Sequence, residues 1–156
     1  SKLNLGVSRV QSLGEAASLS VSLAGQWTDR NLDPAEKMSL GGPSTVRAYD
    51  VSAVSGDLAV VGTFDLRRDL GELGAGIPGT WQLAFFLDAA RATLNSRPWT
   101  DAPNSVTLLG TGAGLEWAGP RRLTARLQLG HRLGETPAGI KASARTRAWA
   151  EFGWKF

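Results

Sequence analysis

Cysteine is absent from this chain of 156 residues, and histidine occurs once, as His131. Disulfides, thiolate chemistry and cysteine-ligated metal sites are therefore excluded, and a single histidine gives little support for a transition-metal site. The formal net charge is only +3, which excludes a highly charged disordered segment. The longest uninterrupted apolar run covers only residues 83–87, whereas a transmembrane helix needs roughly 20 apolar residues. No basic start followed by an apolar core is present, so we expect no signal peptide.

Three features occur in proteins of other functions, but here they lack the context that those functions need. The basic residues form scattered short clusters, such as Arg121 and Arg122, without a gathering of stacking aromatics, so we expect no nucleic-acid partner. Residues 74–79 match Gly-x-Gly-x-x-Gly, but the segment after them alternates like a strand, which favours a hairpin turn over a nucleotide site. His131 lies near a strand end and no Gly-x-Ser-x-Gly occurs, which weighs against a serine triad. We therefore expect no catalytic residue, no metal and no cofactor.

The sequence does contain apolar residues at every second position, which is the period of a β-strand. In residues 18–27, Leu19, Val21, Leu23 and Trp27 fall on one face, and serine and glutamine fall on the other. Turn residues separate this segment from others with the same pattern. We predict an all-β, antiparallel fold of about seven strands, each roughly 9–13 residues long. The remaining segments are 58–67, 81–91, 106–117, 122–133 and 145–156, with a weaker alternation from residue 3.

The length of these segments is typical of strands that cross a membrane. Strands in globular proteins average about 5–6 residues, whereas outer-membrane strands need about 9–11. The apolar faces often end in an aromatic residue, as at Trp27, Trp81, Trp117 and Trp154. A lipid-facing apolar band with aromatic girdles and a polar lumen is the pattern of a transmembrane β-barrel. A soluble β-sandwich with one wet face remains the alternative interpretation of the alternation.

The last segment also carries a feature of outer-membrane proteins. Phe152, Trp154 and Phe156 occupy alternate positions and end the sequence on an aromatic residue. This arrangement resembles the C-terminal signal by which outer-membrane barrels are recognised for assembly. The resemblance implies contact between the final strand and the barrel assembly machinery.

An odd number of strands indicates an incomplete barrel. Bacterial single-chain barrels have even numbers of strands, and an open sheet in lipid would leave backbone groups unpaired at two edges. We therefore expect residues 1–156 to be the C-terminal part of one outer-membrane β-barrel domain. The N-terminal strands and any periplasmic domains would lie outside this chain.

One connection of about thirty residues, between segments 18–27 and 58–67, is long enough to be functional. Gly41, Gly42 and Pro43 permit a tight reversal within it. The connection resembles the loop signature of the two-partner secretion transporters (TpsB type), the haemolysin secretion/activation proteins of Gram-negative outer membranes. The broader superfamily has Val-Arg-Gly-Tyr or Val-Arg-Gly-Phe, and this chain has Ala48 at the glycine position. The resemblance rests on residues 31–33, 36–37, 40–43, 46–49 and 55–57.

This resemblance implies a sixteen-stranded barrel whose sixth extracellular loop folds back into the lumen. It also implies that Arg47 pairs with an aspartate of a Phe-x-Asp motif on the inner wall, and Phe86-Leu87-Asp88 matches that motif. The strand period independently places Phe86 and Asp88 on the polar face. We expect Arg47 and Asp88 to form a loop latch. The residues expected to shape it are Gly41, Gly42, Pro43, Val46, Ala48, Tyr49 and Phe86.

The alternating glycines Gly110, Gly112 and Gly114 could either bend the sheet or leave room for a packed loop. The second use would suit a lumen that holds a folded-in loop.

The function implied by the resemblance is export of a large unfolded partner protein, of haemolysin or adhesin type, across the outer membrane of a Gram-negative bacterium. The expected partners are the secreted protein and outer-membrane lipid, and we expect no enzyme activity. Three alternatives stay open: an outer-membrane assembly insertase of the same superfamily, a soluble β-sandwich binding module, and a barrel enzyme such as a lipase. No triad is visible for the last of these.

Overall fold

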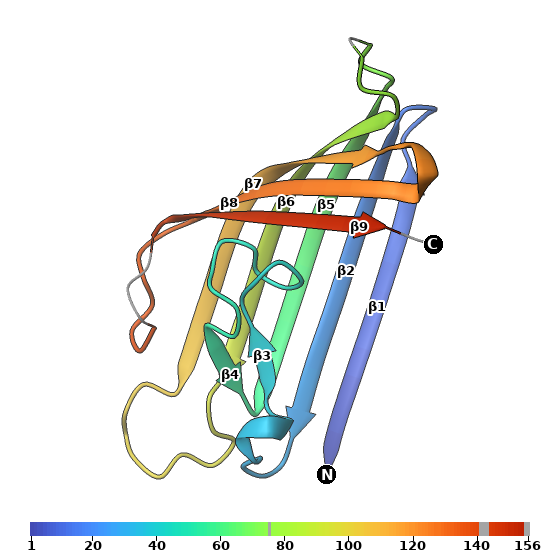
Figure 1. Ribbon diagram of the computed structural model, residues 1–156. Coiled ribbons are helices and arrows are strands. Elements are labelled where there is room, and N and C mark those ends of the chain that lie inside the picture. The colour runs from blue at the N-terminus through green and yellow to red at the C-terminus, as the bar shows by residue number, and fades with distance from the viewer. Residues whose placement is uncertain (75, 141–143, 155–156) are drawn as a thin grey trace.

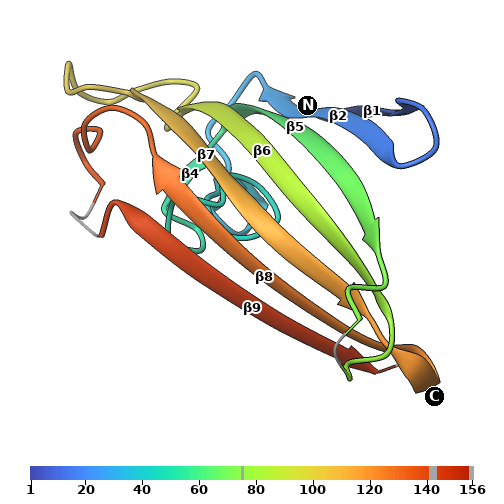
Figure 2. The ribbon, with the colours of Figure 1, turned by 90° about the horizontal axis from the view of Figure 1, so that it is seen from above.

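The computed structural model describes residues 1–74, 76–140 and 144–154. Its main feature is one antiparallel sheet of seven long strands in the order β1-β2-β5-β6-β7-β8-β9, so that each strand pairs with its neighbours along the chain. Figure 1 shows these strands side by side, and Figure 2 shows the curvature of the sheet. The strands are β1 (Lys2–Ser12), β2 (Ala17–Thr28), β5 (Leu58–Gly71), β6 (Thr80–Thr93), β7 (Ser105–Ala118), β8 (Leu123–Arg132) and β9 (Thr146–Trp154).

Successive residues of each strand face opposite sides of the sheet, as the period of two requires. In β6, Phe85 and Leu87 are exposed on the outer face, whereas Phe86 and Asp88 are buried on the inner face. In β5 the buried inner residues include Asp65, while Phe64 is exposed. Apolar side chains outside and polar side chains inside are the arrangement of a barrel wall in lipid.

The two ends of the sheet differ in the length of their connections. Residues 13–16, 72–79 and 119–122 link strands at one end, and the last of these includes the short 3-10 helix η2 (Pro120–Arg122). Residues 29–57, 94–104 and 133–145 link strands at the other end. Because outer-membrane barrels have short periplasmic turns and longer extracellular loops, the second end is the extracellular one. The longest connection therefore starts outside and folds back along the inner face (Figure 1).

That connection has regular structure of its own, which the sequence pattern did not indicate. It contains the 3-10 helix η1 (Pro34–Glu36) and a hairpin of β3 (Met38–Leu40) and β4 (Val54–Gly56). Its apolar side chains pack against small and branched residues on the inner face of the sheet. The resulting buried core consists of Leu40, Val46, Ala48, Tyr49 and Val54 of the loop with Ala59, Val61, Ala90, Ala92, Val106 and Leu108 of the wall.

The predicted strand segments agree with the observed ones apart from their ends. The predicted segment 122–133 is one residue too long at each end, since Arg122 lies in η2 and β8 covers Leu123–Arg132. In β9, Phe152 and Trp154 are 70% and 64% exposed on the outer face, and Phe156 lies outside the described residues. No helix among the described residues is long and apolar enough to cross a membrane.

The outer face gives a test of its lipid contact. Leu87 lies near the middle of β6 and is 48% exposed, so Leu87→Arg should destabilise the barrel by about 2–4 kcal/mol because it places a cation at the bilayer midplane. The measurement is urea unfolding of the full-length protein in lipid vesicles. The matched control is His131→Arg, one residue from the extracellular end of β8, where the cost should be about 0–1 kcal/mol. Equal costs at the two positions would contradict a membrane-spanning sheet.

Candidate functional site

The tip of the long loop is shaped by two glycines. Gly41 and Gly42 have φ angles of 106° and 99°, which side chains with a Cβ rarely adopt. The Gly42 N–H donates to the carbonyl oxygen of Tyr49 at 3.1 Å, and the Gly41 N–H donates to the hydroxyl of Thr45 at 2.8 Å. Both glycines are buried, and Pro43 is exposed in the turn that follows. This reversal directs Arg47 toward the sheet.

Arg47 and Asp88 are in direct contact at the inner face of β6. The guanidinium donates from Nε to Oδ2 at 2.9 Å and from Nη2 to Oδ1 at 2.6 Å. The backbone N–H of Arg47 also donates to Oδ2 at 2.9 Å. Asp88 is fully buried. Two parallel hydrogen bonds fix direction as well as distance, so this contact sets the orientation of the loop tip on the wall.

A second carboxylate completes the site. The remaining terminal nitrogen of Arg47, Nη1, donates to Oδ1 of Asp65 on β5 at 2.7 Å. The ring of Phe86 lies beneath the guanidinium, with 3.6 Å from Cζ to the ring centroid, a cation–π geometry. Asp65 is not among the site residues predicted from the sequence, although its place on the polar face of segment 58–67 was a usable signal. Arg47 therefore joins β5 and β6.

The backbone of the loop tip is also bound, from the side of β8 and β9. The indole N–H of Trp149 donates to the carbonyl oxygen of Arg47 at 2.7 Å. A Cβ built on Gly130 would lie 2.6 Å from that oxygen, and one built on Gly110 would lie 2.6 Å from the Cβ of Ala48. Gly110 and Gly130 thus let the loop approach the wall closely, so the second expected use of the glycine series holds at Gly110. A Cβ on Gly112 or Gly114 would instead meet residues of the wall itself.

Tyr49 and Asp50 extend the contact surface beyond the arginine. Tyr49 is only 1% exposed, and the guanidinium carbon of Arg132 lies 5.7 Å from its ring centroid. Asp50 binds Arg147 of β9, with 2.6 Å between Oδ2 and Nη2. The structure therefore brings together Arg47, Asp88 and Phe86, with Val46, Ala48 and Tyr49 packed behind them in the core. Of the predicted C-terminal signal, Phe152 and Trp154 lie elsewhere, at the other end of β9.

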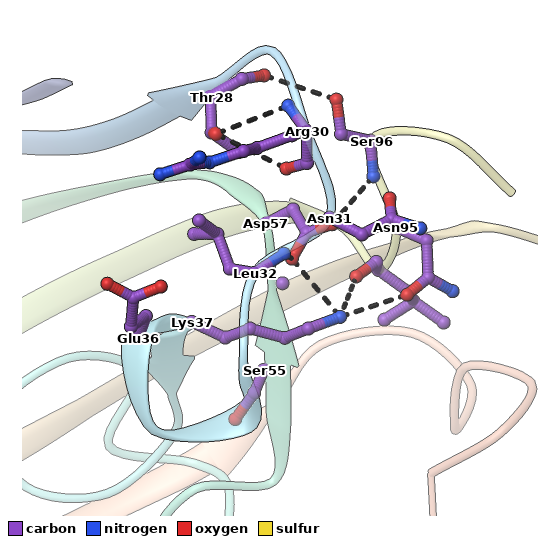
Figure 3. Close-up of polar contacts among 12 residues, drawn as sticks. Thr28, Arg30, Asn31, Leu32, Glu36, Lys37, Ser55, Asp57, Asn95 and Ser96 are labelled. Carbon is purple, nitrogen blue, oxygen red and sulfur yellow. Dashed lines mark hydrogen bonds and ion pairs between the residues drawn. The ribbon is translucent and has the colours of Figure 1, made fainter. Parts of the chain in front are cut away.

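A third buried carboxylate, Asp57, holds the base of the loop at the extracellular end (Figure 3). It is fully buried and accepts hydrogen bonds from the backbone N–H groups of Leu32 at 3.1 Å and Ser96 at 2.8 Å. The ammonium of Lys37 lies 3.2 Å from Oδ1. Burial favours the neutral acid, but the two N–H donors and Lys37 outweigh it, and the pKa of Asp57 lies below its ordinary value. In the sequence, Asp57 stood out only as part of the loop signature.

The described residues contain no group of three or more histidine, aspartate or glutamate side chains that could hold a metal ion. The contacts that the structure does show at the loop tip are charge pairs and hydrogen bonds, centred on one arginine.

Comparison with known proteins gives a family match and structural matches. Residues 1–117 match the family described as "Haemolysin secretion/activation protein ShlB/FhaC/HecB". The fold is similar to that of CdiB from Escherichia coli, with a TM-score of 0.80 and 22% sequence identity, over 97% of this chain and 27% of that chain. This chain therefore spans only 27% of the CdiB chain. The likeness confirms the predicted fold, a part of an antiparallel transmembrane barrel. No curated protein matches this chain.

The close approach at Gly130 predicts that a single methyl group displaces the loop tip. Gly130→Ala should speed hydrogen–deuterium exchange in residues 44–50, because the new Cβ would meet the carbonyl of Arg47, and overpacking costs about 1–3 kcal/mol. The control is Gly6→Ala, whose Cβ would have only the Leu23 carbonyl oxygen nearby, at 4.0 Å. If residues 44–50 exchange at the same rate in the two variants, the loop tip does not rest against β8.

The lowered pKa of Asp57 predicts the pH range in which the loop base loosens. A carboxyl whose pKa is depressed by folding stabilises the folded form above its unfolded value of about 3.9, and this contribution is lost as the pH falls through the folded value. Exchange of the Leu32 and Ser96 amides, corrected for intrinsic rate, should therefore stay constant from pH 7 to about 5 and rise below about 3.9. Asp57→Asn should remove this pH dependence. Faster exchange of these two amides between pH 7 and 5 would contradict the assignment of the pH dependence to Asp57.

Proposed function

We propose that this chain, which belongs to the haemolysin secretion/activation protein family ShlB/FhaC/HecB, forms the C-terminal part of the barrel through which a partner protein crosses the outer membrane. The family consists of transporters of the Gram-negative outer membrane, and the chain is accordingly an outer-membrane protein of two-partner secretion. The exported partner would be a large, unfolded protein of haemolysin or adhesin type. Residues 1–156 would be the C-terminal part of one barrel domain. Strands that precede them would complete the barrel, and the periplasmic domains would precede those strands.

The observation that carries this proposal is a loop that covers the inner face of the sheet and is held there by an ion cluster. Leu40, Val46 and Tyr49 are buried between the loop and the wall. A polypeptide passing along this face would have to displace the loop. The Arg47–Asp88 pair therefore acts as a latch that closes the path in the resting state.

Ionic contacts suit a latch that has to open repeatedly. Arg47 donates to both Asp88 and Asp65, and these bonds can break and re-form without covalent chemistry. Removal of one partner of a buried ion pair costs about 3–5 kcal/mol, because the other charge is left without compensation. A passing chain that supplied its own hydrogen-bonding groups would lower the cost of opening. The export itself would need no nucleotide, and the sequence has no phosphate-binding loop.

The final strand supports a further part of the proposal. Phe152 and Trp154 lie on the outer face of β9, where aromatic and apolar residues meet lipid. Together with Phe156, they would form the signal read by the barrel assembly machinery. These residues would serve assembly of the transporter, whereas the latch would serve transport.

A charge-reversal cycle tests the latch. Arg47→Asp in the full-length transporter should reduce secretion of the partner by about tenfold or more, because the buried pair is replaced by repelling carboxylates. Adding Asp88→Arg should restore part of the secretion, measured as the amount of partner protein in the culture medium. Restoration should be incomplete, because Asp65, which now binds the guanidinium of Arg47, would then face the introduced carboxylate.

The control is Asp33→Asn, an exposed loop position, which should leave secretion unchanged. Barrel assembly is checked by the heat-dependent mobility of each variant in gel electrophoresis. If the double variant secretes no more than the product of the two single effects, Arg47 and Asp88 are not coupled. The latch would then be rejected.

A further inference from the structure

Asp57 joins three segments that are far apart in the sequence. Leu32 and Lys37 belong to the outgoing leg of the long loop, Asp57 ends its returning leg, and Ser96 belongs to the neighbouring extracellular loop, residues 94–104. Lys37 also donates to the carbonyl oxygen of Leu94 at 2.6 Å and to Oδ1 of Asn95 at 2.9 Å. Figure 3 shows these groups converging on one carboxylate and one ammonium.

Further hydrogen bonds tie the same segments together around this pair. The side chain of Asn31 donates to the carbonyl oxygen of Arg97 at 2.8 Å and accepts from its N–H at 2.7 Å. The hydroxyl of Ser96 donates to the carbonyl oxygen of Thr28 at 3.2 Å. Most of these bonds involve backbone groups, so they hold the path of the chain rather than the position of a single side chain.

The hairpin of β3 and β4 separates this base from the tip. Its register pairs Met38 with Gly56 and Leu40 with Val54, so the two legs move as one unit. At the foot of the hairpin, a Cβ built on Gly56 would lie 3.0 Å from that of Ala92 on β6, which shows close contact with the wall. The base and the tip are thus two attachments with different partners: backbone amides and Lys37 at Asp57, and a guanidinium at Asp88.

We propose that Asp57 is the positioning residue of a pivot, which keeps both legs of the loop and residues 94–104 together while the tip leaves the wall. This inference rests on the proposed function, in which the loop has to move for transport. Release of the Arg47 contacts would swing the hairpin about its base, and the loop could return to the same position afterwards. Loss of the Asp57 contacts would free the legs without first breaking the latch.

The chain itself carries two trypsin sites that report on the two attachments. Lys37 lies in the base and Arg47 in the tip, with side chains 15% and 7% exposed. Exposed Arg122, in the turn at the opposite end of the sheet, serves as an internal reference for cleavage. Limited digestion of the full-length transporter in detergent, followed by mass spectrometry, measures the rate of cleavage after each residue.

Asp57→Asn should raise cleavage after Lys37 by about tenfold, because hydrogen bonds to a charged group are lost, and leave cleavage after Arg47 unchanged. Asp88→Asn should do the reverse. Asn31→Ala should raise cleavage after Lys37 by a smaller factor, and since it does not alter the partners of Lys37, its effect reports release of the outgoing leg. Asp33→Asn is the matched control and should change neither rate.

Cleavage that rises at both sites in Asp57→Asn would show one cooperative attachment and overturn the pivot. Unchanged cleavage after Lys37 in both Asp57→Asn and Asn31→Ala would overturn it as well. If Asp57→Asn fails to assemble, Asn31→Ala alone decides between these outcomes. A failure of the proposed function is a different result, namely release of Arg47 in Asp88→Asn with no change in secretion.

Discussion

The contact between one guanidinium and two carboxylates determines how the loop lies in this molecule. Arg47 uses its three nitrogens on Asp88 and Asp65, and both acids are held on adjacent strands of the inner wall. Away from bulk water, such a cluster holds a direction as well as a distance. The core of loop and wall residues, the glycine clearances at Gly110 and Gly130, and the bond from Trp149 all require the loop tip to lie at this point.

The membrane imposes the complementary constraint on the outside of the sheet. Phe64, Phe85 and Leu127 are exposed there, as a lipid-facing wall requires. Lipid does not reach the inner face, so the apolar residues on that face need another covering. The apolar side chains of the loop supply it. The two attachments of the loop carry charges of opposite sign. At the base, the carboxylate of Asp57 accepts from backbone amides. At the tip, the guanidinium of Arg47 donates to carboxylates of the wall.

Sequence reasoning reached the strands, their faces and the family, because a period of two and a loop motif are local signals. The family prediction from the loop motif is confirmed by the match over residues 1–117. The strand period places Asp65 on the polar face, but its contact with Arg47 depends on the register of Asp65 beside Phe86, which spacing does not reveal. The β3–β4 hairpin was missed since each strand has three residues. Asp57 and Trp149 act through segments about 40 and 100 residues away, beyond any local pattern.

The central claim is that charge pairing keeps the loop tip against the inner wall, and a distance between spin labels tests it most directly. Labels are placed on cysteines introduced at Val51 near the tip and Leu127 on the outer face of β8, both exposed, and no other cysteine lies within this chain. Double electron–electron resonance on the full-length transporter should give one narrow distance population. Asp88→Asn should broaden it and shift it to longer distances. An identical distribution in the two proteins would show that the pair does not hold the loop.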